Sequence, residues 1–198
     1  MDLNIRRARK DEAAFIARNI LYAMDIDTDT SGGQSILDIM TEICAMDDTL
    51  YSWRNALVAE LDGTPAGSIT AYDGGLYPEL SKRTFEVFAE KSGGWSYKMD
   101  AETKAGEYYL DSLAVLPSFR GLGLGRQLLV AAMEEAEALG FYTASLIVDP
   151  ESTGVVRLYS SCGFSLDEEC RSQVRPDLPA GHLWCFDYDY LRMTAPLH

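Results

Sequence analysis

Hydrophobic residues in the early part of the chain recur with the spacing of helices. Apolar side chains return every three or four positions over residues 11–24, which predicts an amphipathic helix after a short strand at residues 4–8. The polar stretch 25–34 ends this pattern. A second helix is expected to begin at a Ser35 cap and to carry four apolar residues on one face: Ile36, Ile39, Met40 and Ile43.

An extended pattern follows, with a strong turn signal inside it. Residues 55–61 and 65–72 have the character of two strands, and Asp62-Gly63 separates them. Because glycine tolerates the positive φ of a tight turn, this pair predicts a β-hairpin. Residues 73–106 then interrupt the order, with a helical middle at residues 79–90. We interpret this segment as an excursion from the main fold, either a surface loop or a flap over a binding site.

The second half of the chain alternates strands and helices. A glycine ends each of its two helices, as is common at helix C-termini. The expected strands are residues 107–115, 143–148, 164–170 and 183–190, and the expected helices are residues 121–139 and 153–161. This order predicts an α/β (α+β) fold, with parallel pairing near the centre of the sheet and antiparallel hairpins outside it.

The composition is that of a globular protein. The chain has 198 residues, of which 47% are hydrophobic and 24% charged, and this suits a single domain over residues 1–198 with a core of its own. No apolar run reaches the ~18 residues that a membrane helix requires. The N-terminus carries no secretory signal. We therefore expect a soluble, cytoplasmic protein with no membrane partner.

Charge and cysteine content narrow the expected partners. The formal net charge is −14, and no basic stripe of the kind that binds nucleic acid is present. An acidic protein favours cationic partners instead. The four cysteines show no paired spacing and only two histidines occur, so neither a metal site nor a disulfide framework is expected.

Residues 113–126 have the pattern of an anion-binding turn. An expected strand ends at Pro117, and three alternate glycines then open the next helix. Unpaired N–H groups at a helix N-terminus suit phosphate, and glycines let the backbone approach it closely. Arg120 and Arg126 flank these glycines and add charged donors.

The glycine spacing excludes two common nucleotide-binding turns. A Walker-type loop needs Gly-Lys-Ser/Thr, whereas Gly125 is followed by Arg126 and Gln127. The dinucleotide fingerprint needs G-x-G-x-x-G, and this turn reads G-x-G-x-G. A tight strand-to-helix corner without a ligand is the remaining structural alternative.

Three motifs of this half resemble, in their order, those of the GNAT superfamily of N-acetyltransferases. They read Leu113-Ala114-Val115-x-Pro117, Arg120-x-x-Gly123-x-Gly125 and Leu158-Tyr159-x-x-x-Gly163-Phe164. The resemblance is sharp over residues 108–164 and compatible over residues 4–72. It implies a single GNAT-like domain, with a central mixed, mostly antiparallel sheet, parallel pairing at the cofactor cleft and helices on both faces.

The resemblance implies acetyl-CoA as the donor and assigns residues to it. In the family a bulged strand offers backbone N–H groups to the thioester and the pantetheine arm, and the glycine turn holds the pyrophosphate. Ser152 stands where the family usually has Asn, so its contact is the least certain of the set. The implied donor-binding residues are Leu113, Ala114, Val115, Arg120, Gly121, Leu122, Gly123, Gly125, Arg126, Ser152 and Tyr159.

The catalytic roles follow in part from the resemblance and in part from chemistry. Tyr159 matches the tyrosine that protonates the departing CoA thiolate in many family members. An amine acceptor must lose a proton before it attacks a thioester, which calls for a general base. Asp111 and Glu107 are candidates because alternate positions of a strand share a face, here the face of Leu113. A mechanism without a dedicated base stays open.

We therefore interpret the chain as an N-acetyltransferase that moves an acetyl group from acetyl-CoA to a primary amine by direct attack in a ternary complex, without metal. The acidic charge favours a small cationic molecule or a protein amine, and Tyr77, Trp95 and Tyr97 are candidates to shape the acceptor pocket. Two alternatives stay open: a non-catalytic acyl-CoA-binding sensor or scaffold, and an acyltransferase with another acyl donor. The acceptor's identity and the oligomeric state, a homodimer included, are open as well.

Overall fold

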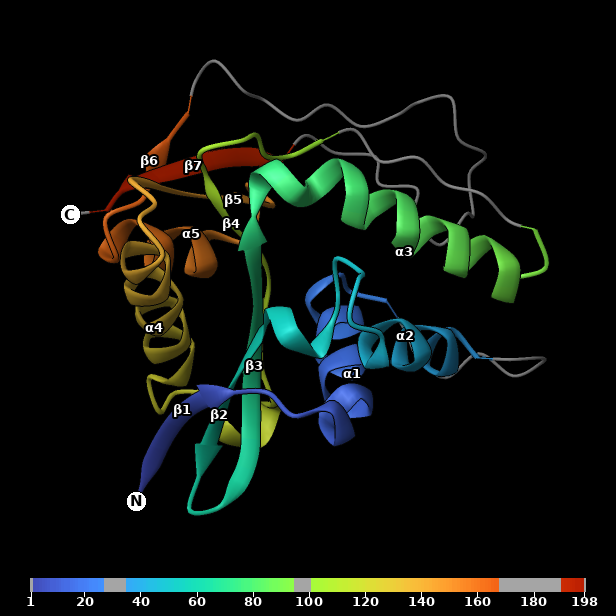
Figure 1. Ribbon diagram of the computed structural model, residues 1–198. Coiled ribbons are helices and arrows are strands. Elements are labelled where there is room, and N and C mark those ends of the chain that lie inside the picture. Colours follow the sequence, from blue (N-terminus) through green and yellow to red (C-terminus); the bar gives the residue numbers. More distant parts are fainter. Residues whose placement is uncertain (1, 27–34, 95–100, 168–189, 198) are drawn as a thin grey trace.

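A seven-stranded sheet organises the computed structural model, which describes residues 2–26, 35–94, 101–167 and 190–197 (Figure 1). In spatial order the strands are β1 (Leu3–Arg7), β2 (Ala56–Leu61), β3 (Thr64–Asp73), β4 (Tyr108–Val115), β5 (Thr143–Val148), β7 (Leu191–Pro196) and β6 (Ser165–Leu166). Among these described strands, β4 and β5 form the one parallel pair, and every other neighbouring pair is antiparallel. The predicted α/β fold with a mixed, mostly antiparallel sheet is confirmed.

Helices cover both faces of this sheet (Figure 1). On one face lie α1 (Ala13–Ala23), α2 (Ile36–Ala45) and α3 (Tyr77–Lys91), and on the other lie α4 (Leu124–Ala138) and α5 (Thr153–Ser161). Each face has its own hydrophobic core. A central strand is therefore buried on both sides, and its alternate side chains enter two different environments.

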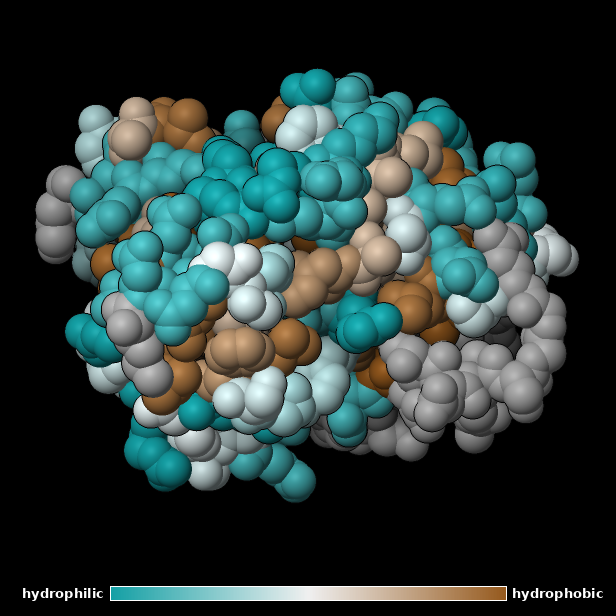
Figure 2. All heavy atoms as spheres, turned by 90° about the horizontal axis from the view of Figure 1, so that it is seen from below, coloured by the Kyte–Doolittle hydropathy of each residue, from teal (hydrophilic) through white to brown (hydrophobic). Residues whose placement is uncertain are grey.

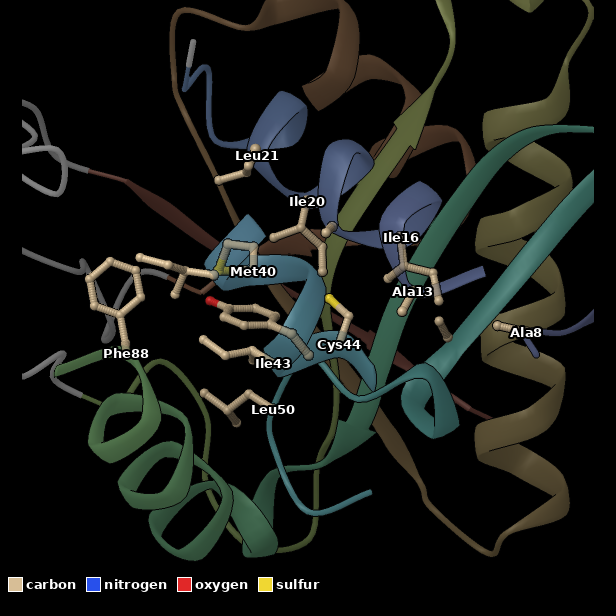
Figure 3. Close-up of a cluster of buried hydrophobic side chains, with 14 of the residues drawn as sticks. Ala8, Ala13, Ile16, Ile20, Leu21, Met40, Ile43, Cys44, Leu50 and Phe88 are labelled. Atoms are coloured by element: carbon tan, nitrogen blue, oxygen red, sulfur yellow. The ribbon is translucent and has the colours of Figure 1, made fainter. Parts of the chain in front are cut away.

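The core beneath α1, α2 and α3 joins the first helices to the excursion. Ile16 and Ile20 of α1 meet Met40 and Ile43 of α2, and Phe88 of α3 lies at the edge of the same cluster (Figure 3). Val87 and Phe88 are both 5% exposed. The helical middle of residues 73–106 is thus part of the core rather than a surface loop.

The excursion leaves the sheet and returns to it at neighbouring positions, where its two ends are in close contact. The Gly74 N–H donates a hydrogen bond of 2.8 Å to the Glu107 carbonyl oxygen. A Cβ on Gly74 would lie 2.3 Å from Thr103 Oγ1 and 2.5 Å from the Lys104 carbonyl oxygen, so only glycine fits here. This closure holds residues 101–107 against the sheet.

Two turns show why the predicted element boundaries shift. Asp62 and Gly63 have φ values of 49° and 79°, the geometry of a tight hairpin turn, which confirms that prediction. Gly121 and Gly123 have φ values of 77° and 78°, so the helix expected from residue 121 begins only at Leu124. Left-handed backbone cannot continue a right-handed helix.

The C-terminal strands differ most from the prediction. The strand expected at residues 164–170 is present as β6 at Ser165–Leu166, and residues 168–170 lie outside the described residues. The strand expected at residues 183–190 also falls outside them, except for Tyr190. The structure instead shows β7 at Leu191–Pro196, where Leu191, Met193 and Ala195 pack against the core beneath α4 and α5.

Candidate functional site

The register of β4 shifts by one residue at Asp111. Thr70 of β3 faces Ser112, whereas Ala71 faces Leu110, so Asp111 is the additional residue of a bulge. The bulge reverses the phase of the strand. Leu113 packs on the α4 side, whereas Asp111 bonds to Tyr72 of the opposite core. The prediction that Asp111 and Leu113 share a face is therefore wrong, since it assumed unbroken alternation.

Strands β4 and β5 separate directly before this bulge. Their parallel pairing comprises Tyr108 with Ala144 and Tyr109 with Ser145. Among the described residues, no ladder partner on the β5 side follows for 110–115, although β4 continues to Val115. The edge of β4 that faces β5 therefore presents backbone groups over the stretch that contains Leu113, Ala114 and Val115, which were predicted to bind the thioester and the pantetheine arm.

The glycine turn lies at the end of β4, beside the first turn of α4. Residues 120–123 are exposed, and open space lies in front of Gly121 and Gly123, where an added Cβ would meet no atom within 4 Å. Arg120 Nε donates to the Val115 carbonyl oxygen at 3.3 Å. Its guanidinium also stacks on the Tyr22 ring of α1, 5.1 Å from the ring centroid, and donates to the Tyr22 hydroxyl.

Helix α5 packs beside the same turn. A Cβ on Gly125 would contact Leu158 Cδ2 at 3.7 Å, and Arg126 Nη1 donates to Ser161 Oγ at 3.0 Å. Ser152 precedes α5, and its side chain makes no capping hydrogen bond. Its Oγ instead donates to Asp149 Oδ2 at 3.4 Å. The Ser152 side chain therefore does not cap the helix.

Tyr159 lies on the α4 and α5 side of the sheet. Its side chain is 8% exposed, and its ring packs against Phe164 with centroids 6.0 Å apart. Burial raises the pKa of Tyr159 to about 12, so the phenol stays protonated at neutral pH. The helix that carries Tyr159 also borders the glycine turn, which places this hydroxyl-bearing residue on the predicted donor side.

Asp111 lies on the other side of the sheet, among tyrosines. Its Oδ2 accepts a hydrogen bond of 2.7 Å from the Tyr72 hydroxyl, and its Oδ1 accepts one of 2.8 Å from Ser112 Oγ. Burial raises the pKa of this carboxyl, although both hydrogen bonds oppose the rise. A carboxylate with a raised pKa is a better proton acceptor than an ordinary aspartate.

The structure adds Glu102, which the sequence prediction missed. Glu102 comes from the end of the excursion, and its Oε2 accepts a hydrogen bond from the Tyr109 hydroxyl. Burial and the charge of Asp111 raise the pKa of Glu102 to about 7, against the effect of the Tyr109 bond. Glu102 precedes β4 in a segment without hydrophobic periodicity, so no sequence pattern marks it. Only the closure at Gly74 brings it to this position.

Glu107 occupies a different environment from Asp111. It forms a buried ion pair with Arg192 of β7 and accepts hydrogen bonds from Ser145 Oγ at 3.0 Å and Thr103 Oγ1 at 3.3 Å. Burial raises its pKa, but the bonds from Arg192 and Ser145 outweigh burial and leave the pKa lowered. These bonds favour a structural ion pair over a general base.

The described residues contain neither a metal-binding cluster nor a membrane-spanning helix. Within the described ranges, no group of three or more His, Cys, Asp or Glu side chains is arranged to hold a metal ion. No helix in that part of the chain is long and apolar enough to cross a membrane. Trp95 and Tyr97, two of the predicted acceptor-pocket residues, lie outside the described residues, whereas Tyr77 is buried in the core beneath α3.

Solved structures share this fold over nearly the whole chain. A crystal structure described as an acetyltransferase is 28% identical, with a TM-score of 0.75 over 98% of this chain and 100% of that one. An N-acetyltransferase of Staphylococcus aureus Mu50 is 22% identical, with a TM-score of 0.77 over 97% of this chain and 100% of the other. The yncA protein of Salmonella typhimurium, a putative acetyltransferase solved with acetyl-CoA, is 18% identical, with a TM-score of 0.62 over 100% of this chain and 95% of that one.

Sequence relatives and a family model agree with the fold. Mycothiol acetyltransferases of Streptomyces griseus and Thermobispora bispora are 37% identical over 71 residues and 40% identical over 65 residues. These matches span 36% and 33% of this chain and about a fifth of the relatives' own length, 22% and 21%. The acetyltransferase (GNAT) family model matches residues 36–164, more than half of the chain. The chain therefore belongs to the GNAT family of acetyltransferases.

Proposed function

We propose that the protein transfers an acetyl group from acetyl-CoA to a primary amine by direct attack, with the two substrates approaching from opposite faces of the sheet. The observation that carries this proposal is the position of Asp111, at a bulge where β4 leaves β5 and on the face opposite Tyr159. A proton acceptor and a proton donor then flank the strand edge that meets the thioester.

The donor side rests on the glycine turn and the edge of β4. Exposed N–H groups at the start of α4, with Arg120 and Arg126 beside them, suit the pyrophosphate of acetyl-CoA. Backbone groups of Leu113 and Val115 suit the pantetheine arm and the thioester oxygen. A Cβ on Gly125 would lie 3.7 Å from Leu158 and 3.8 Å from Val115, so α5 packs beside this edge, and Tyr159 belongs to the same hydrophobic cluster as Leu113 and Val115.

The acceptor side rests on Asp111. An alkylammonium of pKa about 10.4 is almost wholly protonated at pH 7, so the enzyme must remove a proton before the nitrogen attacks. Asp111 takes that first proton. A bond then forms between the nitrogen and the thioester carbon, and the carbon–sulfur bond breaks.

Tyr159 acts on the leaving sulfur. Its phenol donates a hydrogen bond as negative charge develops there, and its proton passes to the sulfur as the second proton of the amine restores the phenol. The products are the acetylated amine and CoA thiol, and the proton held by Asp111 passes to solvent. A raised phenol pKa suits hydrogen bonding to this anion, because the residue never ionises at neutral pH.

Thiol release in the presence of acetyl-CoA and a panel of primary amines tests the proposal. We expect thiol and an N-acetyl product, identified by mass spectrometry, and a loss of about 10²-fold in kcat for Asp111→Asn. Thiol release only with a longer acyl-CoA would support the different acyl donor. An Asp111→Asn variant of unchanged kcat would remove Asp111 from the mechanism.

A further inference from the structure

A second carboxylate, Glu102, accompanies Asp111 on the acceptor face. We infer that Glu102 and Asp111 together bind an acceptor that carries two cationic groups, the reacting amine at Asp111 and a second amine at Glu102. This inference rests on the proposed function and narrows its substrate class from primary amines to diamines.

Two tyrosines hold the two carboxylates in one arrangement. The Tyr109 hydroxyl donates to Glu102, the Tyr72 hydroxyl donates to Asp111, and the two rings lie 5.7 Å apart, centroid to centroid. Burial raises the pKa of both phenols well above the usual value, so both remain donors at neutral pH. Each carboxylate therefore keeps a defined position, as a binding site requires.

Within the described ranges, neither carboxylate is paired with a cation. In the described part of the chain, no lysine or arginine forms an ion pair with Glu102 or Asp111, and no described residue donates to Glu102 Oε1. Glu107, two residues before Tyr109, differs because Arg192 neutralises it. Buried carboxylates in proteins are normally paired. A bound dication would supply the missing charge.

An unpartnered hydroxyl beside Asp111 gives an independent sign of a ligand. Thr70 is 1% exposed, and its Oγ1 has no hydrogen-bond partner in the described structure. Thr70 lies opposite Ser112 in the register, and two positions before Tyr72 on β3, so its side chain lies on the acceptor face. Since buried hydroxyls are normally bonded, this atom suits an N–H donor brought by a substrate.

Within the described ranges, few titratable groups act on the Glu102 carboxylate. Tyr51 and Tyr109 are the titratable side chains beside it, Asp111 acts on it through its charge, and Arg192 of β7 donates to its backbone carbonyl rather than to its carboxylate. Because the pKa of Glu102 is raised to about 7, the carboxylate is only partly ionised at neutral pH. A second amine would bind better as pH rises and Glu102 becomes charged.

Steady-state kinetics with acetyl-CoA and two matched series of acceptors test the inference. One series contains straight-chain diamines with three to six carbons between the amines, and the other contains straight-chain monoamines of the same carbon number. In the wild type we expect kcat/KM for the best diamine to exceed that of the matched monoamine about 10- to 100-fold, as for one charge-assisted hydrogen bond. Glu102→Gln should raise the diamine KM by a similar factor and leave the monoamine constants within about twofold. The diamine KM of the wild type, and not of the variant, should fall as pH rises through about 7.

Two controls separate the outcomes. Glu90→Gln removes an exposed carboxylate of α3 and should leave both series unchanged. Tyr109→Phe removes the hydrogen bond that positions Glu102 and should raise the diamine KM alone. Equal kcat/KM for the two series, or an equal effect of Glu102→Gln on both, would overturn this inference while the proposed function stands. No thiol release with any amine would overturn the proposed function and this inference with it.

Discussion

Two acidic residues of one strand show how the surroundings of a side chain set its chemistry. Glu107 and Asp111 lie on the same face of the sheet around Tyr109, and both are carboxylates. Arg192 and Ser145 hold Glu107 as an anion, whereas Asp111 accepts hydrogen bonds from tyrosine and serine hydroxyls. A carboxylate is thus a structural ion at Glu107, and at Asp111 it is the proton acceptor that we propose.

Replacement of Glu107 tests this division. Glu107→Gln leaves the buried Arg192 with Asp167 as its charged partner, and we expect the free energy of unfolding to fall by about 1.5–3 kcal/mol, the range for a hydrogen bond to a charged group. Because the folded pKa of Glu107 lies below the unfolded value of about 4.3, its stabilisation is present above that pH and is lost as pH falls. Urea unfolding at several pH values measures both effects, with exposed Glu134→Gln as the control. A large loss of kcat at unchanged stability would instead make Glu107 catalytic.

Replacement of Tyr159 by phenylalanine tests its proposed catalytic role without a change in packing. Phenylalanine keeps the ring contact with Phe164 and removes only the hydroxyl. We expect Tyr159→Phe to lower kcat by about 10²-fold, at the lower end for proton-transfer residues, because a phenol of pKa about 12 is a weaker acid than a thiol of pKa about 8.5. Stopped-flow thiol detection measures kcat, and calorimetry should give an unchanged Kd for CoA. An unchanged kcat would exclude a role for this hydroxyl.

At the scale of elements, β4 connects the two halves of the site. Its bulge turns Asp111 toward α1, α2 and α3 and leaves Leu113 and Val115 on the α4 side. An unbroken strand would place these three side chains on one face. In the proposed mechanism, this bulge allows one strand to serve both substrates.

The sequence motifs bring the candidate donor residues together, but they do not bring the candidate acceptor residues together. Arg120, Gly123 and Gly125 are adjacent in sequence, and a strand-to-helix turn brings such residues together whatever the rest of the chain does. Glu102 approaches Asp111 only because the excursion closes at Gly74 and the bulge reorients β4. The closure and the bulge both depend on contacts between residues distant in sequence, and hydrophobic periodicity does not indicate such contacts.

The closure at Gly74 leads to a prediction at this scale. Gly74→Ala would press a methyl group against Thr103 Oγ1 and the Lys104 carbonyl oxygen, and part of this contact is backbone that cannot rotate away. We expect a loss of about 1–3 kcal/mol in the free energy of unfolding, together with a raised acceptor KM, because Glu102 directly precedes the displaced Thr103. Thermal unfolding and steady-state kinetics measure these. Gly154→Ala serves as the control, since its φ is not positive and its added Cβ would meet only Arg157 Nη2, at 4.0 Å. A wild-type KM in the Gly74 variant would show that the closure does not position the acceptor.

Arg120 gives a second prediction for an element, the glycine turn. Its guanidinium is exposed and contacts the Tyr22 ring and the Val115 carbonyl oxygen. It forms no ion pair with a described carboxylate, so its positive charge is available to a phosphate at the turn. We expect Arg120→Ala to weaken CoA binding by about 1.5–3 kcal/mol, the range for a hydrogen bond to a charged group. Arg157→Ala removes the same charge from an exposed position of α5 and controls for the change in net charge. Equal Kd values for CoA in the wild type and the Arg120 variant would contradict the assigned turn.

At the scale of the whole molecule, charge separates the two substrates. The formal net charge is −14, and hydrophilic residues cover much of the face shown in Figure 2, with hydrophobic residues gathered near its middle. A negative field attracts cationic amines over distances far beyond contact and repels the phosphates of acetyl-CoA. The glycine turn with its arginines must bind the donor against this field.

Salt should therefore act on the two substrates in opposite directions. When ionic strength rises from about 0.01 to 0.1 M, the screening length falls from about 30 to 10 Å, and the long-range field is largely removed. We expect kcat/KM to fall several-fold for a diamine and to fall less for the matched monoamine, because attraction scales with the charge of the acceptor. Over the same range kcat/KM for acetyl-CoA should rise or stay constant, because screening weakens the net repulsion. Measurements at saturating partner substrate separate the two constants. A fall in kcat/KM for acetyl-CoA over this range would mean that its local attraction to the arginines, and not the acidic field of the whole chain, governs its encounter with the enzyme.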